Sequence, residues 1–426
     1  MSEKTISETT KSLVDNGKLF NAEFFSANRA RLKNLFLGSA PIVITANGLL
    51  QQSMDTTYPF KQDGNFWYLT GIDEPDIILV LDKEKEYLIV PEQSLSKQNF
   101  DGALDNSELS QISGVSTVLD QKAGWKQLNN RIAKVKHLAT LAPSPSYIES
   151  MAFYTNPARA QLTDKIKEIN PTIDFLDLRQ HFAKMRMVKQ PQELKAIKQA
   201  IAVTIESVNY LKSKMVKNKY QYEYQIEADL TYRFKSKNAT DHGFEPIIAS
   251  GANACVVHYT KNNGQLNHKD LILLDVGAQY AGYSADISRT YSIKSNPSKR
   301  QKQVHQAVID VQEYAYSLLK PGVILSEYEQ KIEQYMGEKL RTLGLIKIVE
   351  RQDIRKYFPH STTHHLGYDV HDLGLYDQPL EPGNVITVEP GIYIPEEGIG
   401  VRIEDDVLIT VDGIEILTNK LSNNLS

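Results

Sequence analysis

The sequence has 426 residues, of which 41% are hydrophobic and 23% are charged, and its formal net charge is -4. A chain of this length exceeds what one hydrophobic core usually serves, so we expect two domains. The acidic balance excludes the basic footprint of a nucleic-acid binder, and we expect no nucleic-acid partner.

Cysteine usage and apolar runs predict where the protein works. The single cysteine, Cys255, cannot form an internal disulfide, which favours a reducing compartment. The segment 1–17 is polar and lacks the apolar run of a signal peptide, and no later segment reaches the roughly 18 apolar residues of a membrane span. We therefore expect a cytoplasmic protein with no membrane partner.

The first third of the chain alternates short apolar runs with helical stretches. Helical periodicity appears at residues 24–36 and 159–168. Four runs rich in β-branched residues and bounded by Gly, Pro, Asp or Lys are typical of strands: 41–46, 77–82, 86–90 and 115–119. This alternation predicts an α/β domain.

The boundary between the domains is expected close to residues 176–190, and we place the domains at 1–178 and 179–426. Just after the boundary, Pro191 and Glu193 predict a helix start. Proline is tolerated in the first turn of a helix, and an acidic side chain suits the positive end of the helix dipole.

The second domain opens with helical periodicity from 192 to about 238, and polar residues near 217–220 predict two helices there. Five strand-like segments and two further helical stretches follow. The strands are expected at 246–250, 271–277, 285–293, 385–394 and 402–410, and the helices at 299–318 and 326–343. This pattern predicts an α+β domain on a mainly antiparallel sheet.

Two carboxylates, Asp275 and Asp286, open the candidate site. The segment 271–291 is typical of two strands joined through a Gly-containing turn, so the carboxylates can lie across adjacent strands. A lone desolvated carboxylate is costly, which calls for a positive partner. The alternative is a turn residue at Asp275 and an ion pair from Asp286 to Arg289.

Four of the ten histidines lie within twelve positions: His360, His364, His365 and His371. His360 and His364 have the spacing of an H-E-x-x-H zinc protease, but Ser and Thr residues separate them, so the catalytic Glu is missing and that zinc site is excluded. A solvated loop is the alternative for this cluster. Gly367 favours instead a tightly turned segment that aims imidazoles into a cleft.

Glu389 and Glu404 lie in segments predicted to be strands and otherwise apolar. Glutamate suits a strand poorly and is costly to bury, and metal ligation explains both placements. Arg402 could be the counter-ion in a structural alternative, but one arginine cannot neutralise four acids. Two divalent cations would balance four carboxylates, and the oxygen-rich ligand set suits a dinuclear site better than a structural zinc site.

Five candidate ligands in chain order carry a resemblance to a known family: Asp275, Asp286, His364, Glu389 and Glu404, in the contexts LLDVGAQYAGYSADISRTY, HHLGYDVHDLG, ITVEPGIYI and GVRIEDD. These motifs resemble those of the pita-bread metallopeptidases, and most closely those of the aminopeptidase P branch. Residues 58–81 also resemble the N-terminal domain of that branch. The resemblance implies an α/β N-terminal domain of the creatinase/aminopeptidase P type, followed by an α+β pita-bread catalytic domain.

The resemblance also implies a role for each ligand. Asp275 would bind one metal ion, and His364 and Glu389 would bind the other. Asp286 and Glu404 would bridge the two ions, which share and activate one water as the nucleophile. Glu389 would take the proton of that water and pass it to the leaving nitrogen.

Five further roles follow from matches to the family motifs. His258 and His371 match histidines that contact the substrate and steady the tetrahedral intermediate, so we count both as catalytic and substrate-binding. Polar loop residues without a task are the alternative for these two. Arg402 and Tyr393 resemble supports of the ligands, and His360 matches a histidine near the site. We count Arg402 as catalytic, and Tyr393 and His360 as substrate-binding.

The implied activity is a metallo-aminopeptidase that hydrolyses the bond between an N-terminal residue and a following proline. Its cofactors would be two divalent metal ions, with Mn²⁺ favoured by the oxygen-rich ligands. Its partners would be a peptide with proline at the second position and further copies of the chain, in a dimer or tetramer. An Xaa-Pro dipeptidase (prolidase) is the alternative enzyme. A non-catalytic pita-bread binding module is the alternative from another class, but such modules usually lack ligands and all five are present here.

Overall fold

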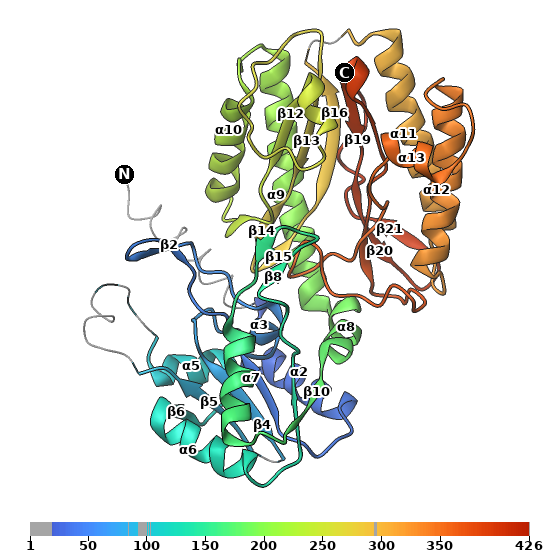
Figure 1. Ribbon diagram of the computed structural model, residues 1–426. Helices are drawn as coiled ribbons and strands as arrows, with labels where there is room; N and C mark the ends of the chain where they lie inside the picture. Colours follow the sequence, from blue (N-terminus) through green and yellow to red (C-terminus); the bar gives the residue numbers. More distant parts are fainter. Residues whose placement is uncertain are drawn as a thin grey trace. The chain divides into compact units, whose positions relative to one another are not determined.

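A computed structural model describes residues 19–83, 85–92, 100, 102, 104–293 and 296–425. The chain forms two compact units, divided between Met185 and Arg186 (Figure 1). The division lies within helix α8 (Arg179–Met187), which occupies most of the segment expected to hold the boundary. The domain ranges 1–178 and 179–426 stay a prediction.

The first unit is built on a six-stranded mixed sheet with the order β10-β7-β1-β4-β5-β6. Strand β1 pairs in parallel with β7 and antiparallel with β4, and β5 pairs in parallel with β6. The sheet strands are β1 (Ile42–Thr45), β4 (Ile78–Asp82), β5 (Lys85–Val90), β6 (Val118–Asp120), β7 (His137–Thr140) and β10 (Asp174–Asp177). Two short hairpins join β2 (Gln51–Ser53) to β3 (Thr56–Thr57), and β8 (Tyr147–Ile148) to β9 (Phe153–Tyr154).

The helices of this unit are α2 (Ala22–Leu35), α3 (Gly64–Thr70), α5 (Asn106–Ser113), α6 (Gln121–Ile132) and α7 (Ala158–Ile169). Helices α6 and α7 pack on the sheet, where Trp125 and Leu162 share a buried apolar cluster with Val43 and Ile89. The predicted strands and helices of this part are confirmed, although the strand expected at 115–119 begins only at Val118.

The second unit begins with α9 (Pro191–Val216) and α10 (Glu223–Ser236). The backbone N–H of Gln190 donates to the side chain of Glu193 at 2.9 Å, which closes the first turn of α9. Proline at the first helical position gives up an N–H that would have no partner within the helix. The predicted helix start and the division into two helices are confirmed.

The strands of the second unit form four antiparallel groups, with the orders β12-β13-β16, β11-β14-β15, β17-β20-β21 and β18-β19. In chain order they are β11 (Asp241–His242), β12 (Ile247–Ser250), β13 (Leu271–Val276), β14 (Ala278–Tyr280), β15 (Tyr283–Ser284), β16 (Ile287–Ser292), β17 (Val385–Val388), β18 (Gly391–Ile394), β19 (Ile399–Arg402), β20 (Asp405–Ile409) and β21 (Ile414–Ile416).

Helices cover these strands from two sides. Figure 1 shows α9 and α10 on one side, and α11 (Lys299–Leu318), α12 (Leu325–Thr342) and α13 (Arg351–Tyr357) on the other. Two 3₁₀ turns, η1 (Gly251–Cys255) and η2 (Pro395–Glu397), complete the unit. The predicted α+β pattern is confirmed. Within the ranges given above, no helix has the length and apolar character needed to cross a bilayer.

Two segments predicted as single strands are each broken in two. The segment 385–394 forms β17 and β18, which belong to different sheets, and Glu389 and Pro390 lie between them. The segment 402–410 contains only the end of β19 and then β20, with Glu404 in the gap. The prediction of one continuous strand at each place is therefore wrong. Pro390 has no N–H for a ladder, which explains the first break.

The two breaks lie opposite each other. Strand β17 pairs with β20 up to Val388 opposite Asp405, and β18 pairs with β19 from Gly391 opposite Arg402. The residues between the strands of the two segments, 389–390 and 403–404, therefore lie where one strand pairing ends and the next begins. Glu389 and Glu404 are brought to the same place because each falls in one of these gaps.

Candidate metal centre

A cavity of about 240 Å³ in the second unit collects most of the predicted site residues. Apolar side chains form part of its wall, among them Phe244, Ile247, Val257 and Val370. The polar wall includes all five predicted ligands and three residues predicted to be catalytic, two histidines and an arginine: Asp275, Asp286, His364, Glu389, Glu404, His258, His371 and Arg402. Segments far apart in the sequence thus supply one site.

Asp275 and Asp286 come from the paired strands β13 and β16. Asp275 lies in β13, and Asp286 lies directly before β16. The guanidinium of Arg289, the alternative partner of Asp286, donates instead to Asp405 Oδ1 at 2.6 Å and to the backbone carbonyl of Glu404. The ion-pair interpretation of Asp286 is therefore wrong.

His364 presents its Nε2 atom to two carboxylates. Its Nδ1 lies 3.0 Å from the carbonyl oxygen of His365, and a carbonyl only accepts, so Nδ1 carries a proton. Nε2 lies 3.4 Å from Asp286 Oδ2 and 3.6 Å from Glu389 Oε1. The lone pair of a neutral imidazole would face two anions here, an arrangement that a cation between them makes favourable.

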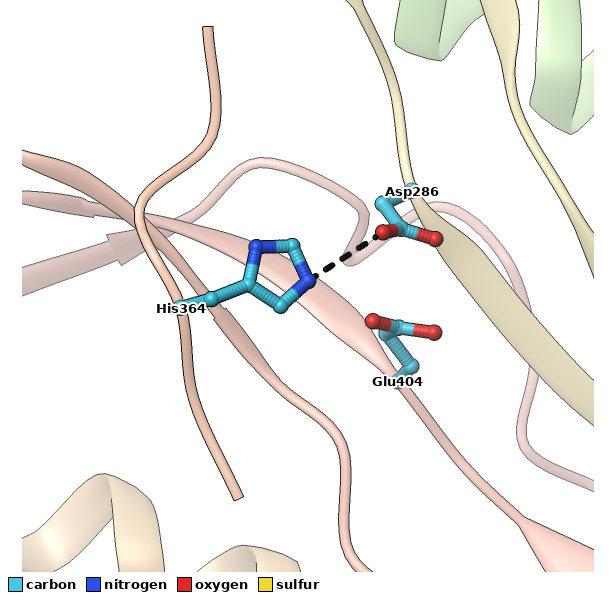
Figure 2. A group of neighbouring side chains, drawn as sticks. All are labelled: Asp286, His364 and Glu404. Atoms are coloured by element: carbon cyan, nitrogen blue, oxygen red, sulfur yellow. Dashed lines mark ion pairs between the residues drawn. The ribbon is translucent and has the colours of Figure 1, made fainter. Parts of the chain in front are cut away.

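Asp286, His364 and Glu404 point toward one another (Figure 2), and one ligand atom from each lies within 4.8 Å of the others. All three side chains are buried. Burial and the nearby carboxylates together raise the pKa of Asp286 and of Glu404 well above their ordinary values. Bringing these groups together as anions is therefore unfavourable without added positive charge.

Two further observations fit a metal centre. Burial raises the pKa of Glu389 to about 7, and the nearby charge of Asp275 adds to the effect, although His364 and Arg402 oppose it. The buried Oδ1 atom of Asp275 has no hydrogen-bond partner among the described residues. A buried oxygen of this kind is costly unless a donor or a cation reaches it. Divalent cations would fill that role and offset the repulsion among the acids.

Arg402 brings a positive charge to the cavity wall. Its Nη2 donates to Asp275 Oδ2 at 2.6 Å, and its Nη1 donates to the hydroxyl of Tyr393 at 2.6 Å. Tyr393 in turn lies 2.7 Å from His360 Nε2, which accepts because Nδ1 of this ring faces a backbone carbonyl. His360 and Tyr393 support Arg402 and are not among the residues that line the cavity. Their predicted contact with the substrate stays a prediction.

His258 and His371 reach the cavity from two loops. The ring of His371 lies 4.1 Å from that of His364, centre to centre. Burial lowers the pKa of His371 to about 4, with the neighbouring histidines adding to the effect, so the ring is neutral at neutral pH. A neutral imidazole can donate one hydrogen bond and accept another, which suits the predicted contact with a substrate.

The sequence interpretation missed Ser288. Its buried hydroxyl accepts from Arg402 Nε at 2.9 Å and donates to Glu404 Oε2 at 2.8 Å. A serine within a strand carries no signal of this role. Ser288 lies opposite Asp275 in the ladder, and only that register reveals it as a link between two site residues.

We expect the Ser288→Ala variant to bind divalent metal 10- to 100-fold more weakly, because partners of metal ligands commonly contribute that much. The substitution removes the hydroxyl that joins Arg402 to Glu404. Calorimetric titration with Mn²⁺ measures the affinity, and thermal unfolding checks the fold. Thr290→Val is the matched control, since Thr290 lies on the same strand and its hydroxyl bonds the backbone of Arg402 rather than a side chain of the cavity wall. If Ser288→Ala and Thr290→Val lose equal metal affinity, Ser288 has only a structural role.

Comparisons with known proteins identify the family. Residues 195–411 match the model of metallopeptidase family M24, and residues 25–139 match that of the aminopeptidase P N-terminal domain. A Xaa-Pro aminopeptidase of Haemophilus influenzae is 32% identical, over 93% of this chain and 94% of the relative. Human Xaa-Pro aminopeptidase 3 is 30% identical, over 88% of this chain and 78% of the relative.

Solved structures agree with the family match. Aminopeptidase P from Escherichia coli, in a low-pH form, has a TM-score of 0.82 at 28% identity and covers 95% of this chain and 96% of its own. An aminopeptidase from Pseudomonas aeruginosa has a TM-score of 0.83 at 26% identity, over 94% and 96%. The predicted order of an aminopeptidase P N-terminal domain and a pita-bread catalytic domain is confirmed. The chain belongs to the aminopeptidase P branch of metallopeptidase family M24 and is a hydrolase with a candidate site for divalent metal.

Proposed function

We propose that this protein removes the N-terminal residue from peptides whose second residue is proline. The observation that carries the proposal is the convergence of four carboxylates and His364 Nε2 on one cavity. The relatives named Xaa-Pro aminopeptidase support the choice of substrate.

Two divalent ions are proposed as cofactors, with manganese favoured because the ligands are mainly oxygen atoms. Asp275 would bind one ion, and His364 and Glu389 would bind the other. Asp286 and Glu404 would bridge them. When bound, such ions polarise the substrate carbonyl and lower the pKa of a shared water.

Glu389 is the proposed proton carrier. Its carboxylate lies on the cavity wall, 3.6 Å from His364 Nε2 and 3.7 Å from His360 Nδ1. A carboxylate in this place can take a proton from the attacking water and give it to the leaving nitrogen. His258 and His371 would hold the substrate from the opposite loops, and Arg402 would keep Asp275 oriented.

Proline at the second position removes an N–H that a peptidase would otherwise bind, and its ring fixes φ. The enzyme must therefore hold the free amino terminus and the ring. The apolar part of the cavity wall, which includes Phe244, Val257 and Val370, offers a surface for such a ring.

An assay on peptides of two lengths tests the proposal. We expect the Mn²⁺-loaded protein to cleave the first bond of Ala-Pro-Ala-Ala, and not that of Ala-Ala-Ala-Ala, because relatives of this chain are named Xaa-Pro aminopeptidases. Product analysis by mass spectrometry measures the cleavage, and the dipeptide Ala-Pro is the length control. Cleavage confined to Ala-Pro would replace the proposal with a prolidase. A protein that binds no metal and cleaves none of them would be a binding module.

The remaining expectations belong to the same proposal. They are domains at 1–178 and 179–426, a cytoplasmic location, assembly into a dimer or tetramer, and the absence of nucleic-acid and membrane partners. The single cysteine, Cys255, supports a reducing compartment. The motifs shared with a family whose members commonly assemble support an oligomer, and light scattering on the purified protein tests it.

A further inference from the structure

The first residue of α10, Glu223, is fully buried and is surrounded by hydrogen-bond donors. Five donors reach its two oxygens, and all five are neutral groups. Oε1 accepts from Ser250 N at 2.7 Å, Ser250 Oγ at 2.8 Å and Asn253 Nδ2 at 3.0 Å; Oε2 accepts from Tyr259 Oη at 2.9 Å and Gly264 N at 2.6 Å. A carboxylate is the side chain best suited to accept so many bonds, since it has two acceptor oxygens and no donor.

These donors lie at both ends and in the middle of one loop, residues 250–264. The loop leaves β12 at Ser250, and its far end bonds the start of α10. There the backbone N–H of Glu223 donates to the carbonyl of Gly264 at 3.0 Å. A Cβ atom on Gly264 would lie 2.5 Å from Asn253 Nδ2 and 2.8 Å from Glu223 Oε2, so a larger residue there would displace the side chains of this network. Glu223 therefore fastens the loop along its whole length.

The same loop carries His258 to the cavity. The neighbouring Tyr259 is buried, and its ring packs in an apolar cluster with Ile247 and Leu273. Its hydroxyl donates a hydrogen bond to Glu223. His258 itself is exposed and lies on the cavity wall. Because Tyr259 is held at both its ring and its hydroxyl, the direction in which the adjacent His258 leaves the backbone is set as well.

We propose that Glu223 is a positioning residue that holds His258 toward the substrate. The inference rests on the proposed function, in which His258 contacts the peptide. Glu223 touches neither the cavity nor a predicted ligand in any of these contacts, so it acts through the loop. Glutamine in its place would turn an NH₂ group toward N–H and O–H donors, and a half-satisfied buried network loosens the segment it holds.

The test compares Glu223→Gln with Glu227→Gln, the same change one helical turn later. Among the described residues, the side chain of Glu227 accepts one bond, from Asn262 Nδ2 at 2.9 Å, which a glutamine oxygen can keep. On Ala-Pro-Ala-Ala we expect kcat/KM to fall 10- to 100-fold for Glu223→Gln, a typical cost for a residue that orients another. We expect less than a threefold change for Glu227→Gln. In Glu223→Gln, the metal content should stay at the wild-type value, and backbone amide hydrogen exchange in residues 250–264 should be faster than in the wild type.

A double-mutant cycle with His258→Ala separates positioning from general stability. If Glu223 works through His258, Glu223→Gln should cost less than threefold in the His258→Ala background, because the group it positions is already gone. If the double variant instead loses kcat/KM by the product of the two single-variant losses, the two residues act independently and the proposal is overturned. A Glu223→Gln protein as active as the wild type would overturn it too.

Tyr259→Phe keeps the proposal testable if Glu223→Gln does not fold. This variant retains the packed ring and removes one donor to Glu223, and we expect a smaller loss of kcat/KM that again disappears in the His258→Ala background. A loss that persists there would count against the proposal. An inactive wild-type enzyme would mark a failure of the proposed function itself, and the exchange of residues 250–264 in Glu223→Gln would still decide whether Glu223 holds the loop.

Discussion

Glu389→Ala is expected to reduce turnover by several orders of magnitude while the protein stays folded. The substitution removes a proposed ligand and the proposed proton carrier together, and acid–base catalysis alone is commonly worth about 10²–10⁴-fold. Glu389 lies in the gap between β17 and β18, so the pairing of these strands does not depend on its side chain. The kcat on Ala-Pro-Ala-Ala and the thermal unfolding midpoint are the two measurements.

The Glu389→Gln variant separates the role of Glu389 as a metal ligand from its role as a proton carrier. The amide keeps an oxygen for a metal ion but cannot carry a proton, so we expect it to bind more metal than the alanine variant and to remain nearly inactive. Glu397→Ala serves as the control, since Glu397 forms an exposed ion pair with Arg300 in the same unit. Near-normal turnover in either Glu389 variant would reject the assignment of this residue.

Removing divalent metal is expected to abolish activity, and adding Mn²⁺ should restore it. The buried acids of the cavity wall have one arginine among them, and burial beside other carboxylates raises the pKa values of Asp286 and Glu404, so these two are poorly compensated as anions. Dialysis against a chelator, elemental analysis and a peptide assay before and after Mn²⁺ measure the effect. Full activity in metal-free protein would contradict the dinuclear site.

The stability of the metal-free protein should also depend on pH. The pKa of Glu389 is about 7 in the folded protein against an ordinary value of 4.5, so the folded state binds its proton more tightly than the unfolded state does. This contribution favours folding at low pH and is lost as the pH rises from 4.5 through about 7. Bound cations take the place of protons, so the rise in melting temperature on adding Mn²⁺ should be larger at pH 8 than at pH 5. A larger rise at pH 5 would contradict this reasoning.

Short stretches of sequence were enough to predict the candidate ligands, several helix ends and the fold class of each domain. Asp275, Asp286, Glu389 and Glu404 were singled out as candidate ligands because carboxylates in apolar runs need an explanation, and His364 because its motif is specific; all five line one cavity. The α9 start at Pro191 followed from helix-end preferences, and the separation of α9 from α10 followed from the polar residues near 217–220. Both signals act within a few residues of the chain. The α/β and α+β classes followed from periodicity, which is likewise local.

The arrangement of the site depended on contacts between distant segments. Sequence patterns suggested unbroken strands at 385–394 and 402–410, whereas Glu389 and Glu404 lie in opposite gaps between two ladders. Arg289 was near enough in the chain to pair with Asp286, yet its guanidinium binds Asp405. Ser288 and Glu223 gained their roles from strand register and from a folded loop. Hydrogen bonding and burial at these positions depend on which strands and loops meet, and no short stretch of sequence carries that information.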